Sequence, residues 1–207
     1  MIKVISFDIG GTLVKKAKRE NARDEMMKMA GVSSPLFAHA YREHFIKKKN
    51  SLKDFCDKIG FSDIDKMEQF LRQYYASAPL GNLYDDVLST LDELVKKGYL
   101  LISISNKSYM NHYGLKEYGL TSYFTREIYS YEVNSAKPET EIFKYAQRKM
   151  RVMNDEIIHI GDSWTSDIEG AHRAGWKSVL IVREKKNIPM SKVECTISNL
   201  NELLVML

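Results

Sequence analysis

Hydrophobic and polar positions divide the chain into an alternating part and a purely helical part. In the alternating part, short apolar or β-branched runs bounded by turn-forming residues predict buried strands. These runs lie at residues 2–7, 99–103, 127–130, 156–160 and 178–182. Segments with apolar residues at helical spacing separate or follow them, at 83–97, from about 107, from 138, at 167–174 and at 199–206. This alternation predicts an α/β core whose parallel sheet is covered by helices on both faces.

The second part, from about residue 15 to residue 78, has a polar and helical pattern. Phe37, Tyr41 and Phe45 recur at every fourth position, as on one face of a helix. Turn-forming segments at 31–35, 50–51 and 60–63 divide this stretch into about four helices, and no run within it predicts a strand. The chain is therefore expected to form a core domain from residues 1–14 and 80–207, interrupted by a small all-helical insertion at 15–79.

Composition narrows the class of protein. The chain has 207 residues, of which 44% are hydrophobic and 28% charged, which is typical of a globular protein and excludes extensive disorder. The net charge of +4 is too small to indicate nucleic-acid binding. Residues 14–80 carry 14 basic and 9 acidic side chains, an excess of +5, whereas the remainder carries −1. A basic insertion suits an anionic substrate, although a solvated helical surface would carry the same charges.

Cysteine usage and hydropathy bear on the cellular environment. Cys56 and Cys195 lie far apart and form no Cys-x-x-Cys pair, so neither a disulfide scaffold nor a cysteine zinc site is expected. No apolar run approaches the ~20 residues of a membrane span, and the N-terminus does not resemble a signal peptide. We therefore expect a cytoplasmic protein that binds neither membrane nor nucleic acid. We also expect a monomer or homodimer.

Polar residues follow the predicted strands at the points where ligands bind in open α/β sheets. They are Asp8, Gly10, Gly11 and Thr12 after the first strand, Ser105 and Asn106 after the second, Lys137 after the third, and Asp162 and Asp167 after the fourth. Clustered carboxylates repel one another unless a cation is present, and oxygen ligands suit Mg²⁺. A carboxylate can also attack phosphorus, while hydroxyl, amide and ammonium groups hold the phosphoryl oxygens.

Four segments in order resemble the motifs of the haloacid dehalogenase-like (HAD) superfamily of hydrolases, most of which are Mg²⁺-dependent phosphatases. They are Phe7-Asp8-Ile9-Gly10-Gly11-Thr12-Leu13, Ile104-Ser105-Asn106, Ala136-Lys137-Pro138-Glu139, and Ile160-Gly161-Asp162 continuing to Asp167. The resemblance covers residues 1–14 and about 80–207. It implies a Rossmann-like core, and the helical insertion is similar in position to the cap that this family inserts after its first motif.

The resemblance also implies roles for the residues at the strand ends. Asp8 would be the nucleophile, and Mg²⁺ would be held by Asp8, the Gly10 carbonyl and Asp162. Asp167 would complete the metal site from close by, holding metal-bound water or Lys137. The phosphoryl group would be bound by Gly11, Thr12, Ser105, Asn106 and Lys137. Thr12 would also donate toward Asp8. Lys137 would orient the nucleophile and balance the acidic cluster, so the expected catalytic residues are Asp8, Lys137 and Ser105. His159, within a buried strand, is expected to be a satisfied core residue.

Gly10 departs from the pattern of the family's phosphatases. These enzymes usually carry a second Asp at that position, which protonates the leaving oxygen, and such a general acid typically contributes about 10²–10⁴-fold to the rate. The resemblance therefore implies a phosphatase of low or selective activity, which acts on a small phosphorylated molecule through an aspartyl-phosphate at Asp8. Two alternatives remain open: a catalytically impaired binding or regulatory protein on the same fold, and a phosphonatase-like or dehalogenase-like branch. In the phosphonatase-like case, Lys47, Lys48 and Lys49 would be candidates for a Schiff base.

Overall fold

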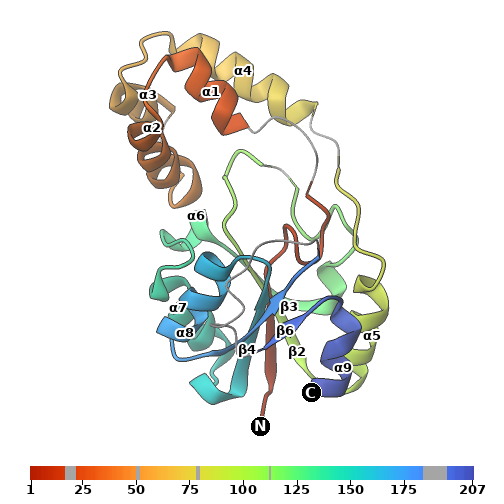
Figure 1. The fold of residues 1–207 in the computed structure, drawn as a ribbon. Coiled ribbons are helices and arrows are strands. Elements are labelled where there is room, and N and C mark those ends of the chain that lie inside the picture. Colours follow the sequence, from red (N-terminus) through yellow and green to blue (C-terminus); the bar gives the residue numbers. More distant parts are fainter. Residues whose placement is uncertain (17–21, 50–51, 78–79, 112, 184–194) are drawn as a thin grey trace.

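One parallel sheet of six strands organises the part of the chain that the computed structural model describes, namely residues 1–16, 22–49, 52–77, 80–111, 113–183 and 195–207 (Figure 1). The strand order is β3-β2-β1-β4-β5-β6, so the first strand lies in the middle of the sheet. The strands are β1 (Val4–Phe7), β2 (Leu100–Ser105), β3 (Phe124–Tyr129), β4 (Ile157–Gly161), β5 (Lys177–Ile181) and β6 (Thr196–Ile197). The expected parallel sheet is confirmed.

Helices cover both faces of this sheet, as the sequence predicted. Helices α5 and α9 pack on one face, and α6, α7 and α8 lie on the other (Figure 1). Val4 and Ile5 point to opposite faces of β1, and each belongs to a different apolar cluster beneath its own layer of helices. The bounds are α5 (Val87–Lys96), α6 (Ser130–Val133), α7 (Thr140–Met150), α8 (Glu169–Arg173) and α9 (Leu203–Met206).

A group of helices, here called the cap helices, lies above the carboxyl ends of the strands (Figure 1). They are α1 (Ala22–Ala30), α2 (Ser34–Tyr41), the π-helical turn η1 (Arg42–Ile46), α3 (Leu52–Ile59) and α4 (Ile64–Ala76). They enclose an apolar core of their own, in which the rings of Phe45 and Phe55 lie 4.8 Å apart between centroids. The described residues of this stretch contain helices and no strand, as predicted.

The segment that leads to the cap helices and the segment that returns from them lie side by side at the edge of the core. Val14 and Leu83 form an antiparallel bridge, and the Lys15 amide donates to the Asn82 carbonyl at 2.7 Å. Tyr84 in turn donates to the Leu13 carbonyl at 3.0 Å. The two connections to the cap helices are thus paired with each other through backbone hydrogen bonds.

The helix predicted from about Lys107 is wrong for the described residues 107–111 and 113–120, which form turns. Polar side chains close these turns: Ser108 Oγ accepts from the Met110 amide at 3.2 Å, and Asn111 Oδ1 accepts from the Tyr113 amide at 3.0 Å. Such local hydrogen bonds compete with the helical ones. Strand β3 also begins three residues before the predicted run, and β6, with only two residues, was not predicted. None of the helices in the described ranges is both long and apolar enough to span a bilayer.

Candidate active site

The parallel strands end at one edge of the sheet, and the polar residues that follow them in the sequence meet there. Phe7 of β1 pairs with Ser103 of β2 on one side and with Ile160 of β4 on the other. Asp8, Ser105 and Asp162 therefore emerge at the same edge. The connections leaving β1 and β4 run toward opposite sides of the sheet, and ligands of open α/β folds bind at such a switch point.

Lys137 forms the buried centre of this edge. Its ammonium group lies 2.6 Å from Asp8 Oδ1 and 2.5 Å from Asp167 Oδ1, and the residue is only 2% exposed. Burial alone would lower the pKa of Lys137, but the two carboxylates outweigh it and raise the pKa, so the side chain remains charged. A buried charge is tolerated only when it is paired in this way.

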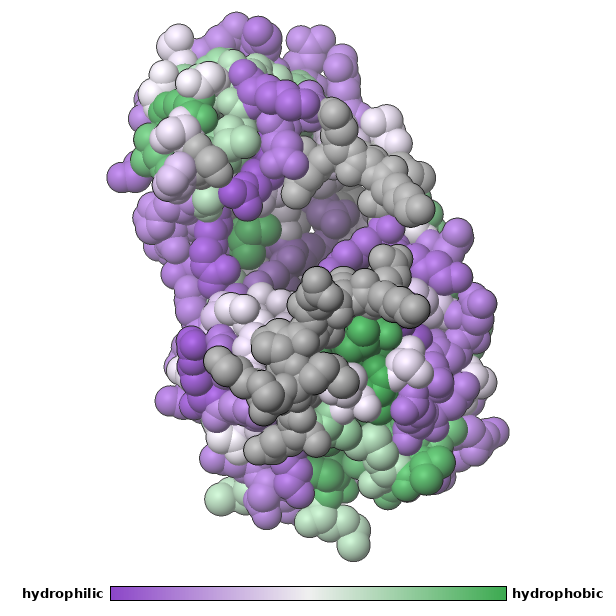
Figure 2. Space-filling view, in the orientation of Figure 1, coloured by the Kyte–Doolittle hydropathy of each residue, from purple (hydrophilic) through white to green (hydrophobic). Residues whose placement is uncertain are grey.

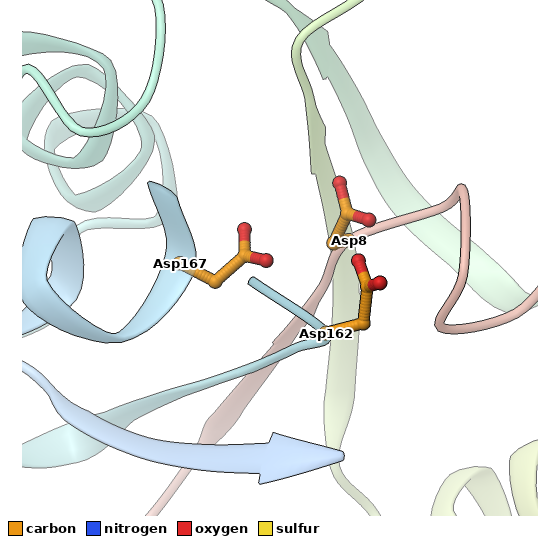
Figure 3. Close-up of side chains that lie close together, drawn as sticks. All are labelled: Asp8, Asp162 and Asp167. Carbon is orange, nitrogen blue, oxygen red and sulfur yellow. The ribbon is translucent and has the colours of Figure 1, made fainter. Parts of the chain in front are cut away.

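Three carboxylates converge beside this lysine. Asp8, Asp162 and Asp167 each place an oxygen within 4.8 Å of the others, and their side chains point toward one another (Figure 3). Burial raises the pKa of Asp8 to about 6; Lys137 opposes this effect, and the negative charges of Asp167 and Asp162 add to it. The ionised form of Asp8 is thus held at an energetic cost, which a bound cation would relieve.

Asp167 has a different environment from Asp8, although the two share a lysine. Its Oδ1 also lies 3.3 Å from His159 Nε2, and its Oδ2 accepts from the Ser163 amide at 2.9 Å. Burial would raise the pKa of Asp167, but Lys137 and His159 hold it well below its usual range. Asp167 therefore stays ionised and anchors Lys137, a contact that the sequence had suggested. Both oxygens of Asp167 already have hydrogen-bond partners.

His159 extends this network into the sheet. Its Nδ1 lies 2.9 Å from the hydroxyl of Ser6, the residue beside it in β1, and burial lowers the pKa of the imidazole, which is therefore neutral. The expectation of a satisfied core histidine is confirmed. Its contact with Asp167 was not foreseen, because it depends on the turn that follows β4.

The two glycines after Asp8 have different surroundings. Gly11 has φ +91°, and a Cβ there would lie 2.6 Å from Asp162 Oδ2, so a side chain would collide with the acidic cluster. A Cβ at Gly10 would meet no heavy atom within 4 Å. The backbone therefore requires glycine at position 11, whereas the absence of an acid at position 10 has no steric cause.

Thr12 does not make the predicted contact with Asp8. Its hydroxyl is buried and has no hydrogen-bond partner among the described residues. The loop is closed by backbone bonds instead, such as that from the Leu13 amide to the Ile9 carbonyl at 2.9 Å. The carbonyl of Thr12 accepts from Arg183 Nη2 at 2.7 Å, so main-chain contacts hold this turn.

Asn106 supports Lys137 from the neighbouring strand end. Its Nδ2 donates to the Lys137 carbonyl and its Oδ1 accepts from the Lys137 amide, both at 2.8 Å. This reciprocal pair fixes the backbone of Lys137 and was not foreseen from the sequence. Ser105, the last residue of β2, is half-buried. Binding of a phosphoryl group by Gly11, Thr12, Ser105, Asn106 and Lys137 stays a prediction.

Lys16 is a further cation at the site that the sequence did not single out. Its ammonium group lies 2.6 Å from Asp162 Oδ2, while the side chain is 61% exposed. Lys16 comes from the connection to the cap helices, and nothing in the local pattern distinguishes it from other lysines of that stretch. Its contact shows that Asp162, at the edge of the cluster, is within reach of a cation from the solvent side.

Comparison with known proteins identifies the family. A family model described as haloacid dehalogenase-like hydrolase matches residues 2–175. The chain belongs to this family. Its membership confirms both the resemblance seen in the four motifs and the expectation of a hydrolase.

Individual HAD-like relatives include several phosphatases. A glyceraldehyde 3-phosphate phosphatase of Methanopyrus kandleri is 30% identical over 201 residues, which cover 89% of this chain and 86% of the relative. A pyrimidine 5'-nucleotidase of Streptococcus pneumoniae is 26% identical over 84% of this chain and 81% of its own length. A crystal structure of a 2-haloacid dehalogenase from Pseudomonas syringae superposes with a TM-score of 0.69 at 22% identity, covering 99% of this chain and 97% of the other, which shows a shared fold.

The donor set of the HAD-like site fits a hard divalent cation. Asp8 and Asp162 offer carboxylate oxygens within 4.8 Å of each other, and Gly10 adds a backbone carbonyl in the same loop as Asp8. Oxygen donors of this kind suit Mg²⁺. Burial, opposed by Lys137, raises the pKa of Asp8, so a bound cation would stabilise the ionised form of this carboxyl. The residues present therefore fit the metal that this family generally uses.

Proposed function

We propose that this chain is a Mg²⁺-dependent phosphatase that acts on a small phosphorylated molecule, with Asp8 as its nucleophile. The observation that carries the proposal is the placement of Asp8: a carboxylate at a strand end, 2.6 Å from the buried Lys137 and adjacent to Asp162. The relatives named as a glyceraldehyde 3-phosphate phosphatase and a pyrimidine 5'-nucleotidase support the same reaction class.

In the proposed reaction, a carboxylate oxygen of Asp8 attacks phosphorus, and the bond from phosphorus to the leaving oxygen breaks. The resulting aspartyl-phosphate is then hydrolysed by water, which releases inorganic phosphate and restores the carboxylate. Lys137 holds Asp8 in position and offsets the charge of the transferring group, while Ser105 and the backbone of Gly11 bind its oxygens. A bound Mg²⁺ supplies further charge neutralisation.

Gly10 sets the preference among substrates. With no carboxyl group at this position, nothing in the first motif protonates the leaving oxygen. The rate of hydrolysis falls least for substrates whose leaving groups are stable anions, such as acyl and aryl phosphates. It falls most for alkyl phosphates, whose leaving oxygen needs a proton. We therefore propose an enzyme that is selective for good leaving groups, or one whose substrate supplies its own proton.

The helical insertion would act as the cap of this enzyme, with residues 15–79 as one domain and residues 1–14 and 80–207 as the core. The molecular surface is hollowed between the cap helices and the sheet, and hydrophilic residues line much of this hollow (Figure 2). A cap in this place would exclude water from the site and select the substrate.

An assay with acetyl phosphate and an aryl phosphate in the presence of Mg²⁺ tests the proposal. Wild type, Asp8→Asn and Gly10→Asp are compared; the last variant is sterically allowed because position 10 has open space. We expect wild-type turnover that disappears in Asp8→Asn. We also expect Gly10→Asp to accelerate hydrolysis of an alkyl phosphate by about 10²–10⁴-fold.

The alternatives predict different results in the same assay. An inactive wild type with an active Gly10→Asp would indicate a binding or regulatory protein that has lost only its proton donor. Activity of wild type that persists in Asp8→Asn would contradict the proposed nucleophile. In the phosphonatase-like alternative Lys47 would need a neutral amine; burial lowers its pKa, but the ion pairs with Glu43 and Glu139 outweigh burial and raise it, which favours the protonated form.

A further inference from the structure

One seam between the cap helices and the core involves η1. On the core side it is formed by the loop after β2, by α6 and by the loop that follows α6. The Tyr109 amide donates to the Phe45 carbonyl at 3.1 Å, and Ser130 Oγ donates to the Ile46 carbonyl at 2.7 Å. Core donors thus satisfy the carbonyls at the carboxyl end of η1, which have no partner within the helix itself.

At the other end of η1, Arg42 reaches the loop that carries Lys137. Its Nη2 lies 3.0 Å from the Ala136 carbonyl, 3.3 Å from the Lys137 carbonyl and 3.3 Å from Glu139 Oε1. An arginine from the cap helices therefore donates to the backbone of the residue whose side chain holds Asp8. About two-thirds of the Arg42 side chain is removed from solvent in this contact.

Two independent supports meet at the Lys137 carbonyl. Asn106, on the core side, donates to it at 2.8 Å, and Arg42 donates to it from the cap side. The loop is also closed internally, because Glu139 Oε2 accepts from Ser135 Oγ at 3.1 Å and from the Ala136 amide at 3.3 Å. Of the groups that fix this loop, Arg42 belongs to the element that must move if the cap opens.

We propose that Arg42 is a positioning residue that couples docking of the cap to the placement of Lys137. With the cap docked, Arg42 and Asn106 hold the carbonyl of Lys137 from both sides, and the ammonium group meets Asp8. With the cap displaced, the loop keeps only its core support, and Lys137 samples a wider range of positions. The inference rests on the proposed function for its kinetic consequence, but its structural part is independent of the reaction.

Lys47 provides a matched control within the same seam. Its ammonium group contacts Glu139 Oε1 at 3.2 Å and Glu43 Oε1 at 3.1 Å. It thus shares the carboxylate partner of Arg42, and no bond from it to a carbonyl of the 135–139 loop is found among the described residues. If the two cations only paired with Glu139 across the seam, replacing either of them would have the same effect. Arg42 also donates to the backbone carbonyl of Lys137, so positioning of Lys137 predicts a larger effect at Arg42.

Arg42→Met, Arg42→Lys and Lys47→Met test this with two readouts. The first is hydrogen–deuterium exchange of peptides covering 135–139, which needs no substrate. We expect faster exchange there in Arg42→Met, partial restoration in Arg42→Lys, and exchange like wild type in Lys47→Met. The second readout is steady-state kinetics, in which Arg42→Met should lower kcat by roughly tenfold or more with a smaller change in KM, because misplacement of a catalytic group acts on the chemical step.

Unchanged exchange at 135–139 in Arg42→Met would overturn the proposal, as would equal effects of Arg42→Met and Lys47→Met. Exchange in β1 and β4 serves as a control for folding, and Arg42→Lys retains the charge if the methionine variant is destabilised. If wild type shows no phosphatase activity, the proposed function fails, while the exchange measurement still decides whether Arg42 holds the Lys137 loop.

Discussion

The edge of the sheet and the cap helices use buried residues in opposite ways. At the sheet edge, Asp8, Lys137, Asp167 and His159 are buried charged or polar groups joined in one network of hydrogen bonds. The buried residues of the cap helices are apolar, and the rings of Phe37, Phe45 and Phe55 pack together among them. Buried polar groups cost free energy unless their partners are in place, whereas apolar packing stabilises without such precision. The buried polar network therefore lies in the core, whereas apolar packing holds the cap helices together.

Removal of the Lys137 ammonium group should produce the largest loss of stability in this comparison. Lys137→Met leaves Asp8 and Asp167 buried without their shared partner, and breaking such a buried pair costs about 3–5 kcal/mol. Urea denaturation of the variant measures this loss, and phosphatase activity should fall with it. Lys47→Met, in the cap helices, removes an ion-paired lysine at a partly exposed site and should cost at most about 1 kcal/mol. Similar losses in the two variants would refute the distinction between the regions.

Truncation of a cap ring should damage only the cap. Phe55 is fully buried, and its ring lies 5.5 Å from that of Phe37 and 4.8 Å from that of Phe45, so Phe55→Ala should cost about 3–5 kcal/mol. If the cap is a domain of its own, hydrogen exchange should rise in the cap helices while the strands remain protected. Phe7→Ala, in β1, is the matched core variant. Loss of protection throughout the molecule in Phe55→Ala would show that the two parts unfold as one.

The pH dependence of stability should reveal the free energy that is needed to keep Asp8 ionised in the folded protein. Its pKa is about 6 in the folded protein against an ordinary value of 3.8, so ionisation opposes folding at high pH and not at low pH. This difference corresponds to roughly 3 kcal/mol. In metal-free buffer, Asp8→Asn should therefore melt at a higher temperature than wild type at pH 8, and the gap should close between pH 6 and pH 4. A gap that does not change with pH would contradict the raised pKa, and added Mg²⁺ should narrow it.

The two glycines of the first loop give the smallest and most local test. Gly11→Ala forces a side chain into a left-handed backbone and against Asp162, which should cost about 1–3 kcal/mol. The variant should also weaken Mg²⁺ binding in calorimetry because Asp162 is displaced. Gly10→Ala has open space and should stay within about 0.5 kcal/mol of wild type. Equal stability of the two variants would show that the loop rearranges freely.

Features carried by local pattern could be predicted from the sequence. The run Val4–Phe7 is apolar at three of its four positions and fully buried, and it could be recognised as a central strand. Polar residues directly after such strands meet at one edge, so the approach of Asp8, Lys137, Asp162 and Asp167 followed from the parallel sheet. The predicted helix after Lys107 failed because side-chain hydrogen bonds of Ser108 and Asn111 stabilise turns there, which apolar periodicity does not report.

Features that depend on contacts between distant segments could not be predicted. Arg42 and Glu139 are 97 positions apart, and Lys16 and Asp162 are 146 apart. Neither pair has a local signature, because many surface lysines and arginines have the same neighbours in sequence. The reciprocal bonds of Asn106 with Lys137 also depend on how the two loops pack. In this protein the sequence indicated which residues gather at the site, and the tertiary structure determined which residues hold them in place.

The antiparallel bridge between Val14 and Leu83 has a consequence for how this protein can be rebuilt. Because the chain departs and returns at two hydrogen-bonded neighbours, the intervening residues form a closed excursion whose ends already meet. A two-residue hairpin turn is long enough to connect two such neighbours. We therefore expect that the segment between them can be replaced by a short turn, or by another domain with adjacent termini, without changing the path of the sheet. On the proposed function, replacing a single continuous stretch of the gene would present the core site to different substrates, and the replacement would have to restore the contact that Arg42 makes with the Lys137 loop.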